Sequence, residues 1–181
     1  MVYTKADSVK IRELVNNGES IWSIWEEYGT RGLKVAETAL RRKKVPDNIY
    51  RKVYWYWGPT GSGKTRTAYK HKGIVNAEMR GKWFRLYRGE KAIVFDNIYR
   101  RTYKCVDLIH YISRECRTVP TDIGSVPALY EEVIITSLYH PEDLYRVADS
   151  EDMYQEIYLK RLLSLITEIV PFGDAKRRSE Y

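Results

Sequence analysis

Cysteine, histidine and long apolar runs are scarce in this sequence of 181 residues. The two cysteines, Cys105 and Cys116, form neither a C-x-x-C pair nor a metal-binding spacing with the three histidines, so we expect reduced thiols without chemistry of their own. No apolar stretch approaches the length needed to cross a bilayer, and the first residues lack the apolar segment of a signal peptide. These absences predict a soluble, globular, intracellular protein with no membrane partner.

Positive charge is concentrated in the first part of the chain. Residues 1–104 carry a net charge of +13 and residues 105–181 carry −6, which leaves +7 overall. A basic surface suggests a polyanionic partner, because the neutralisation of phosphates supplies affinity that does not depend on sequence. Two other interpretations stay open: a solvated surface without a partner, and head-to-tail contacts between basic and acidic faces of neighbouring subunits.

Residues 58–65 read Gly-Pro-Thr-Gly-Ser-Gly-Lys-Thr and fit the Walker A pattern G-x-x-x-x-G-K-[ST]. They follow an extended apolar run at 53–57 and precede a helix that we expect from Lys64 to about His71. In such a loop the backbone N–H groups surround a polyphosphate, the lysine reaches its oxygens, and the threonine hydroxyl binds Mg²⁺. The sequence therefore predicts ATP and Mg²⁺ as cofactors, with these binding residues: Gly58, Pro59, Thr60, Gly61, Ser62, Gly63, Lys64, Thr65 and Arg66.

A second apolar strand, at residues 91–97, ends in Asp96 and Asn97. Ligands of open α/β sheets bind at the carboxyl ends of the strands, so we expect Asp96 to lie beside Thr65 and to help hold Mg²⁺. The amide of Asn97 can orient a water molecule but cannot accept its proton. Either the general base lies elsewhere, or hydrolysis is slow.

Residues 4–44 are expected to form three short helices, separated at Gly18 and Gly29 and ended before Pro46. Such a unit suits a helix-turn-helix DNA reader, an oligomerisation collar or a simple packing module. We place a helical domain at 1–46 and a P-loop ATPase domain at 47–181, an α/β fold with a central, mostly parallel sheet.

Other segments complete this α/β pattern. We expect a strand at 73–76, a helix at 103–113, a hairpin-like loop at 117–129, a buried parallel strand at 133–137, later helices from Pro141, and a strand at 165–170. Residues 81–89 interleave aromatic and basic side chains, including Lys82 and Trp83, and either stack on bases or belong to the core.

In this order, the motifs resemble the helicase half of the replication-associated protein (Rep) of circular single-stranded DNA viruses, of the circovirus and cyclovirus type. The resemblance covers roughly residues 50–170 and includes Walker A, Lys82-Trp83-Phe84, the strand ending at Asp96, the loop at 119–127 and Ile134-Ile135-Thr136-Ser137. It implies a superfamily 3 helicase with an AAA+-related fold, which forms a homo-oligomeric, hexameric ring on single-stranded DNA in the host nucleus. The helical region, with Arg31-Gly32-Leu33, then resembles the oligomerisation collar.

The resemblance also implies roles for single residues. The catalytic set is Lys64, Asp96, Asn97, Ser137 and Arg161, of which Arg161 is an arginine finger that reaches the nucleotide of the neighbouring subunit. The implied DNA-binding set is Lys82, Trp83, Arg117, Asp122, Ile123, Gly124 and Ser125. Three positions depart from the family pattern: Asn97 replaces the second acid, Leu138 a common Asn, and Asp122 the usual Lys of the hairpin loop.

We therefore predict an ATP-dependent single-stranded DNA translocase or helicase that acts in rolling-circle replication of a small circular DNA genome. The nicking endonuclease half is expected to be absent, because the three histidines form no His-hydrophobe-His pair. Two alternatives are a small-molecule P-loop kinase and a nucleotide-gated DNA-binding ring that does not hydrolyse ATP.

Overall fold

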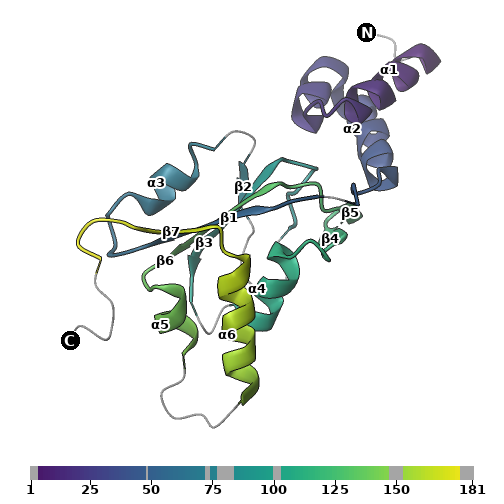
Figure 1. Cartoon of the computed structure of the whole chain (residues 1–181). Helices are drawn as coiled ribbons and strands as arrows, with labels where there is room; N and C mark the ends of the chain where they lie inside the picture. Colours follow the sequence, from purple (N-terminus) through teal and green to yellow (C-terminus); the bar gives the residue numbers. More distant parts are fainter. Residues whose placement is uncertain are drawn as a thin grey trace.

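The computed structural model describes residues 4–47, 49–71, 74–76, 84–99, 103–146 and 153–175. Its centre is a five-stranded sheet with the order β2-β3-β6-β1-β7, in which all paired strands are parallel (Figure 1). The strands are β1 (Lys52–Trp57), β2 (Ile74–Asn76), β3 (Ala92–Ile98), β6 (Glu132–Ser137) and β7 (Glu168–Pro171). The predicted α/β class with a parallel central sheet is confirmed.

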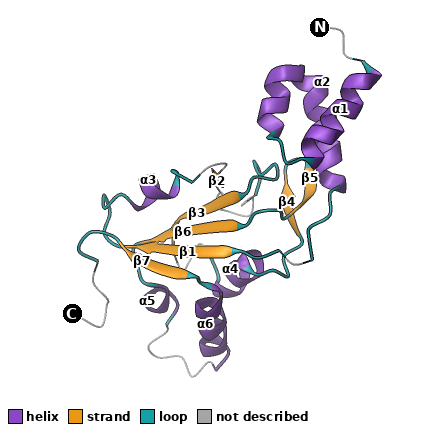
Figure 2. Ribbon diagram, turned by 45° about the horizontal axis from the view of Figure 1, so that its top comes forward, coloured by secondary structure: helices purple, strands orange, loops and turns teal. Residues whose placement is uncertain are grey.

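Helices cover both faces of the sheet. Helix α3 (Lys64–Ala68) lies on one face, and α4 (Cys105–Ile112), α5 (Pro141–Tyr145) and α6 (Met153–Leu165) lie on the other (Figures 1 and 2). Trp55 and Trp57 of β1 belong to the larger core, whereas Tyr56 packs with Ala68 of α3 on the opposite side. Because both faces are covered, the strands are nearly continuous apolar runs.

Aromatic side chains fill the core beside β3. Phe84 stacks on Tyr130 with a ring-centroid distance of 6.0 Å, and its ring also contacts the edges of Tyr87 and Phe95. Phe84 and Tyr87 are fully buried, so this part of the aromatic and basic stretch belongs to the core. Lys82 and Trp83 lie outside the described residues, and their DNA contacts stay a prediction.

The N-terminal helical unit consists of α1 (Lys5–Asn16) and α2 (Ile21–Arg42). The hydroxyl of Ser20 accepts a hydrogen bond from the Trp22 N–H at 3.2 Å and caps the start of α2. Gly29 interrupts α2 with φ 63° and ψ −163°, a conformation that favours glycine. The expected break at Gly29 is therefore present, and three helical segments form the unit.

A two-stranded hairpin lies between this unit and the core. It consists of β4 (Thr118–Thr121) and β5 (Gly124–Pro127), paired antiparallel, as expected for residues 117–129. Helix α2 packs against β5 (Figure 2).

Two predicted boundaries were wrong. Helix α3 ends at Ala68 instead of near His71, because the Lys70 and His71 N–H groups bond three residues back, in tighter turns. Strand β7 begins at Glu168 instead of residue 165, because α6 extends to Leu165.

Arg51 is a buried cation that joins several backbone segments beneath the hairpin. Its guanidinium donates hydrogen bonds to four carbonyl oxygens and lies 4.4 Å from the ring centre of Tyr130. The acceptors are the carbonyls of Ser113, Cys116, Ala128 and Tyr130.

We expect Arg51→Met to lower the free energy of unfolding by about 2–3 kcal/mol, since buried carbonyl groups then lose their donor. Urea unfolding followed by circular dichroism measures the change. Arg12→Met is the matched control, because Arg12 is exposed on α1 and should shift stability by less than about 0.5 kcal/mol. Equal midpoints for the two variants would show that Arg51 does not stabilise the fold.

Candidate nucleotide site

The loop from Gly58 to Gly63 connects the carboxyl end of β1 to α3. Gly61 and Gly63 have φ values of 80° and 91°. At Gly58, a Cβ atom would lie 2.2 Å from the carbonyl oxygen of Phe172, which follows β7. The end of β7 thus requires glycine at Gly58, and the left-handed turns leave a bare backbone that a polyphosphate can approach.

Lys64 is the first residue of α3, and its side chain turns back into this loop. Its ammonium donates hydrogen bonds to the carbonyls of Gly58 and Pro59, each at 2.8 Å, and to the Ser62 hydroxyl at 3.3 Å. Burial lowers the pKa of Lys64, although the nearby Asp96 carboxylate acts in the opposite direction. A phosphate beside the ammonium would stabilise its charged form, so the loop fits a polyphosphate ligand.

The structure brings Asp96 and Thr65 together although they lie on different elements. Oδ1 of Asp96 accepts hydrogen bonds from the Thr65 hydroxyl at 2.9 Å and from the Thr136 hydroxyl at 2.6 Å. Thr65 and Asp96 therefore present two oxygen atoms at the start of α3, a donor set that fits Mg²⁺.

Thr136 is the contact that sequence reasoning missed. Phe95 of β3 pairs with Ile135 of β6, so the next residues, Asp96 and Thr136, lie side by side toward the carboxyl ends of the two strands. That register is the signal that could have identified Thr136, once the two strands were known to be neighbours. Its side chain is buried, which holds the hydroxyl in position.

Asn97 occupies an irregular point of β3. The strand register shifts between Phe95 and Ile98, and Asn97 has φ 54°, a left-handed conformation that Asn tolerates better than most residues. Its N–H donates to the Thr136 hydroxyl at 2.7 Å, and its side-chain amide donates to the Tyr99 hydroxyl. The amide is thus bonded to Tyr99, and its predicted role with water stays a prediction.

The side chains of Ser137 and Arg161 make their contacts outside the phosphate-binding loop. The Ser137 hydroxyl is buried and donates to the Ile98 carbonyl at 3.2 Å, while its own carbonyl accepts from the Gly58 N–H at 3.3 Å. Arg161 is on α6, across the sheet from α3, and its guanidinium lies 3.5 Å from the Glu115 carboxylate (Figure 1). Within one chain, Ser137 reaches the loop through its backbone, and Arg161 lies on the other face.

The hairpin lies at the other end of the sheet from α3 (Figures 1 and 2). It carries the described residues predicted to bind DNA, namely Arg117, Asp122, Ile123, Gly124 and Ser125. The predicted nucleotide and DNA contacts therefore occupy separate places. Thr60 and Arg66 are exposed residues of the loop and of α3.

Neither cysteine shows a sign of reactivity. Both are free thiols, and burial raises the pKa of Cys105 to about 11 and that of Cys116 above its usual value. In the described ranges, no group of three or more His, Cys, Asp or Glu side chains could hold a metal ion. None of the helices described there combines the length and apolar character needed to span a membrane.

Walker A follows β1, and Asp96 lies near the carboxyl end of β3, with β6 between the two strands. This arrangement defines a P-loop NTPase core.

The sequence is similar to two proteins named replication-associated protein. It is 29% identical over 134 residues to that of Canary circovirus, and 30% identical over 121 residues to that of Beak and feather disease virus. These matches cover 74% and 67% of this chain, and 45% and 42% of the relatives. Over the matched region the chain resembles the replication-associated proteins of circoviruses, and it spans less than half the length of the curated relatives it matches.

No protein-family model matches the sequence. Among solved structures, the *S. cerevisiae* Hsp104-ADP complex is similar with a TM-score of 0.44 and 13% identity, over 90% of this chain and 30% of that one. The strand order and the position of the P-loop define the fold class.

Proposed function

We propose that this chain is an ATP-driven single-stranded DNA translocase, the helicase part of a protein that replicates a small circular DNA genome by a rolling circle. The observation that carries the proposal is the 2.9 Å hydrogen bond between Thr65 of Walker A and Asp96 at the end of β3. Support for a replicative role comes from the replication-associated relatives. Hydrolysis of ATP and binding of DNA are parts of the proposal.

In this proposal, the side chains of Lys64, Thr65 and Asp96 and the backbone of the loop have separate roles. Lys64 would contact the phosphate oxygens of bound ATP, and Thr65 and Asp96 would hold Mg²⁺. When bound, Mg²⁺ neutralises charge on the phosphate oxygens. The loop backbone positions the phosphates for in-line attack by water, which is the main way in which such sites accelerate the reaction.

We further propose that the chain works as a homo-oligomer, a hexameric ring in the host nucleus, in which Arg161 completes the site of the neighbouring subunit. Arg161 is about half exposed, and its ion pair with Glu115 is solvated and weak. It can therefore exchange this carboxylate for an anionic partner on another chain. An arginine there offsets the charge that develops on the γ-phosphate.

Arg161→Ala is expected to lower ATP turnover by about a hundredfold or more, if the arginine acts from a neighbouring subunit. Phosphate release at several protein concentrations measures this, and turnover per chain of the unaltered protein should rise with concentration as rings form. Arg146→Ala is the matched control, since Arg146 is an exposed arginine paired with Glu142. Unchanged turnover in Arg161→Ala, together with turnover independent of concentration, would contradict a shared site.

One observation favours a second function, a nucleotide-gated DNA-binding ring that does not hydrolyse ATP. The Asn97 amide donates to Tyr99, and an amide is no base. An assay of phosphate release with and without single-stranded DNA, beside a measurement of ATP binding, separates the two functions. Tight ATP binding without phosphate release favours the gated ring, and phosphate release stimulated by DNA favours the translocase.

A further inference from the structure

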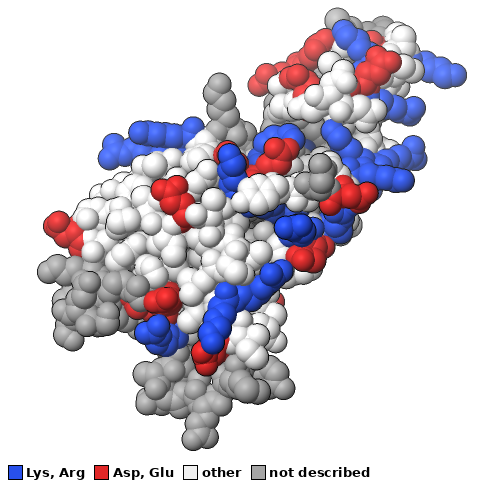
Figure 3. Space-filling view, in the orientation of Figure 1, with Lys and Arg blue, Asp and Glu red and all other residues white. Residues whose placement is uncertain are grey.

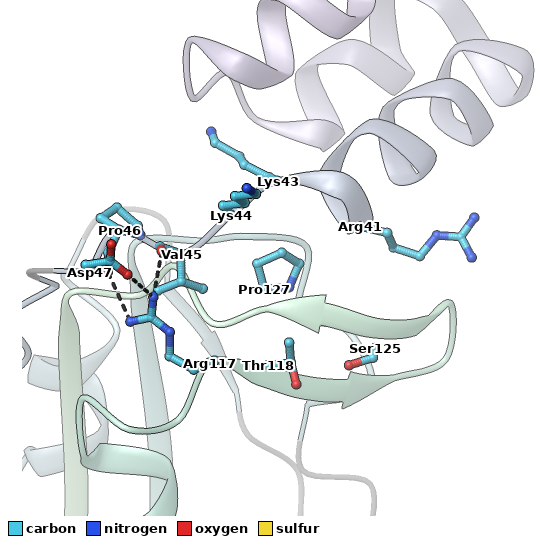
Figure 4. A pocket seen from close by; sticks show the side chains of 10 residues that line it. All are labelled: Arg41, Lys43, Lys44, Val45, Pro46, Asp47, Arg117, Thr118, Ser125 and Pro127. Carbon is cyan, nitrogen blue, oxygen red and sulfur yellow. Dashed lines mark hydrogen bonds and ion pairs between the residues drawn. The ribbon is translucent and has the colours of Figure 1, made fainter.

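A groove lies where the helical unit joins the hairpin, away from the P-loop. It has a volume of about 740 Å³, which is ample for a ligand site. We call it the linker–hairpin groove, and Figure 4 shows its lining residues: Arg41, Lys43, Lys44, Val45, Pro46, Asp47, Arg117, Thr118, Ser125 and Pro127. They come from the end of α2, from the linker that follows it and from both hairpin strands.

The lining of the groove is positively charged. Four of its side chains are cationic, and its one carboxylate, Asp47, lies 3.0 Å from the Arg117 guanidinium. On the face shown in Figure 3, Lys and Arg are numerous over the N-terminal helices and their junction with the core, with Asp and Glu among them.

Two of the four cations hold the walls of the groove. Arg117 donates to the carbonyls of Val45 and Pro46 at 2.9 and 3.2 Å, which fixes the linker against the hairpin (Figure 4). Lys43 donates to the Val15 carbonyl at 3.0 Å at the end of α1. Lys44 and Arg41 are exposed, and Thr118 and Ser125 add hydroxyls to the lining. Arg41 makes two long hydrogen bonds, to the Ile123 carbonyl at 3.4 Å and to the Thr38 hydroxyl at 3.5 Å, which a phosphate could replace.

The tip of the hairpin is a poorer place for an anion. Asp122 lies 2.6 Å from Arg88, whose side chain is 7% exposed and also pairs with Glu37 of α2 at 3.3 Å. Arg41 donates to the neighbouring Ile123 carbonyl at 3.4 Å. These contacts tie the tip to the helical unit, and its carboxylate would repel a phosphate. Asp122, which departs from the family pattern, is therefore a partner of Arg88.

We propose that the linker–hairpin groove binds the phosphodiester backbone of single-stranded DNA, with Lys44 and Arg41 as the main phosphate contacts. Thr118 and Ser125 add neutral hydrogen bonds, of the kind that position a backbone without reading bases. The inference rests on the proposed translocase function and moves its DNA contact from the hairpin tip to the groove. Affinity here is electrostatic, so it falls as salt rises.

The test is the binding of the whole chain to a fluorescent oligothymidylate, measured by anisotropy over a range of salt concentrations. Lys44→Glu is expected to weaken binding by roughly tenfold, and Lys44→Glu with Arg41→Glu by more. Each lost phosphate contact should reduce the slope of log K against log salt by about 0.7. Neither side chain is buried, and thermal unfolding verifies that each variant is folded.

Lys5→Glu is the matched control, because it makes the same change of charge at the exposed start of α1, remote from the groove (Figure 1). Weaker binding and a smaller slope in the groove variants, with Lys5→Glu near the unaltered chain, support the proposal. If the groove variants match Lys5→Glu, the groove is not the DNA site, although the translocase proposal stands. If the unaltered chain does not bind the oligothymidylate, the translocase proposal itself fails.

Discussion

Lys64→Ala is expected to reduce ATP hydrolysis by about a thousandfold while the chain stays folded. The ammonium is the cation that the loop holds at its centre, 2.8 Å from the carbonyls of Gly58 and Pro59. Positioned charges of this kind act on the phosphate oxygens where negative charge develops, and the loss of one such donor typically costs about a hundred- to a thousandfold in rate. Phosphate release under saturating ATP measures the effect.

Lys70→Ala is the control for this experiment, because Lys70 follows the same helix but is exposed. We expect its turnover to match that of the unaltered chain. Binding of a fluorescent ATP analogue to Lys64→Ala separates lost binding from lost chemistry. If Lys64→Ala keeps most of its turnover, the loop is not the hydrolytic site and the proposed function has no chemical basis.

Local patterns predicted the parts of the fold that depend on local chemistry. Walker A, the strand before it and the strand that ends in Asp96 are each visible as short runs of residues. Gly29 predicted the interruption of α2 for the same reason, since a left-handed turn favours a particular residue type.

The contacts that sequence could not supply join residues far apart in the chain. Thr136 reaches Asp96 only because β6 lies next to β3, and strand order is not written in either segment. In the sequence, Arg51 is only a basic residue that precedes a strand. Its hydrogen-bond partners are backbone carbonyl groups, which occur at every residue and therefore leave no sequence signal. Such contacts need the assembled sheet.

Two of the three departures from the family pattern, Asn97 and Asp122, have a structural explanation. Asn97 sits at a strand irregularity with φ 54°, where Asn is tolerated. Asp122 pairs with a buried arginine that also holds Glu37 of α2. The two residues thus bear on different things: Asn97 on the proposed hydrolysis, and Asp122 on the attachment of the hairpin to the helical unit.

Asp96→Asn is expected to lower turnover by about a hundred- to a thousandfold, because an amide cannot replace the negative charge that faces Mg²⁺. The Asn side chain keeps the size of Asp and an oxygen for the Thr65 and Thr136 hydroxyls, so the sheet should remain intact. Turnover measured against Mg²⁺ concentration is the assay, and half-maximal activity should require more Mg²⁺. An unchanged Mg²⁺ dependence would place the metal elsewhere.

Thr136→Val tests whether the Thr136 hydroxyl orients the Asp96 carboxylate. The variant keeps the shape of the buried side chain but removes the donor 2.6 Å from Asp96, and partners of metal ligands typically contribute about ten- to a hundredfold. It also removes the acceptor for the Asn97 N–H, so thermal unfolding is measured beside turnover. Thr136→Ser restores the hydroxyl and should recover most of the activity. If Thr136→Ser is as impaired as Thr136→Val, the methyl group matters through packing, and Thr136 does not orient Asp96.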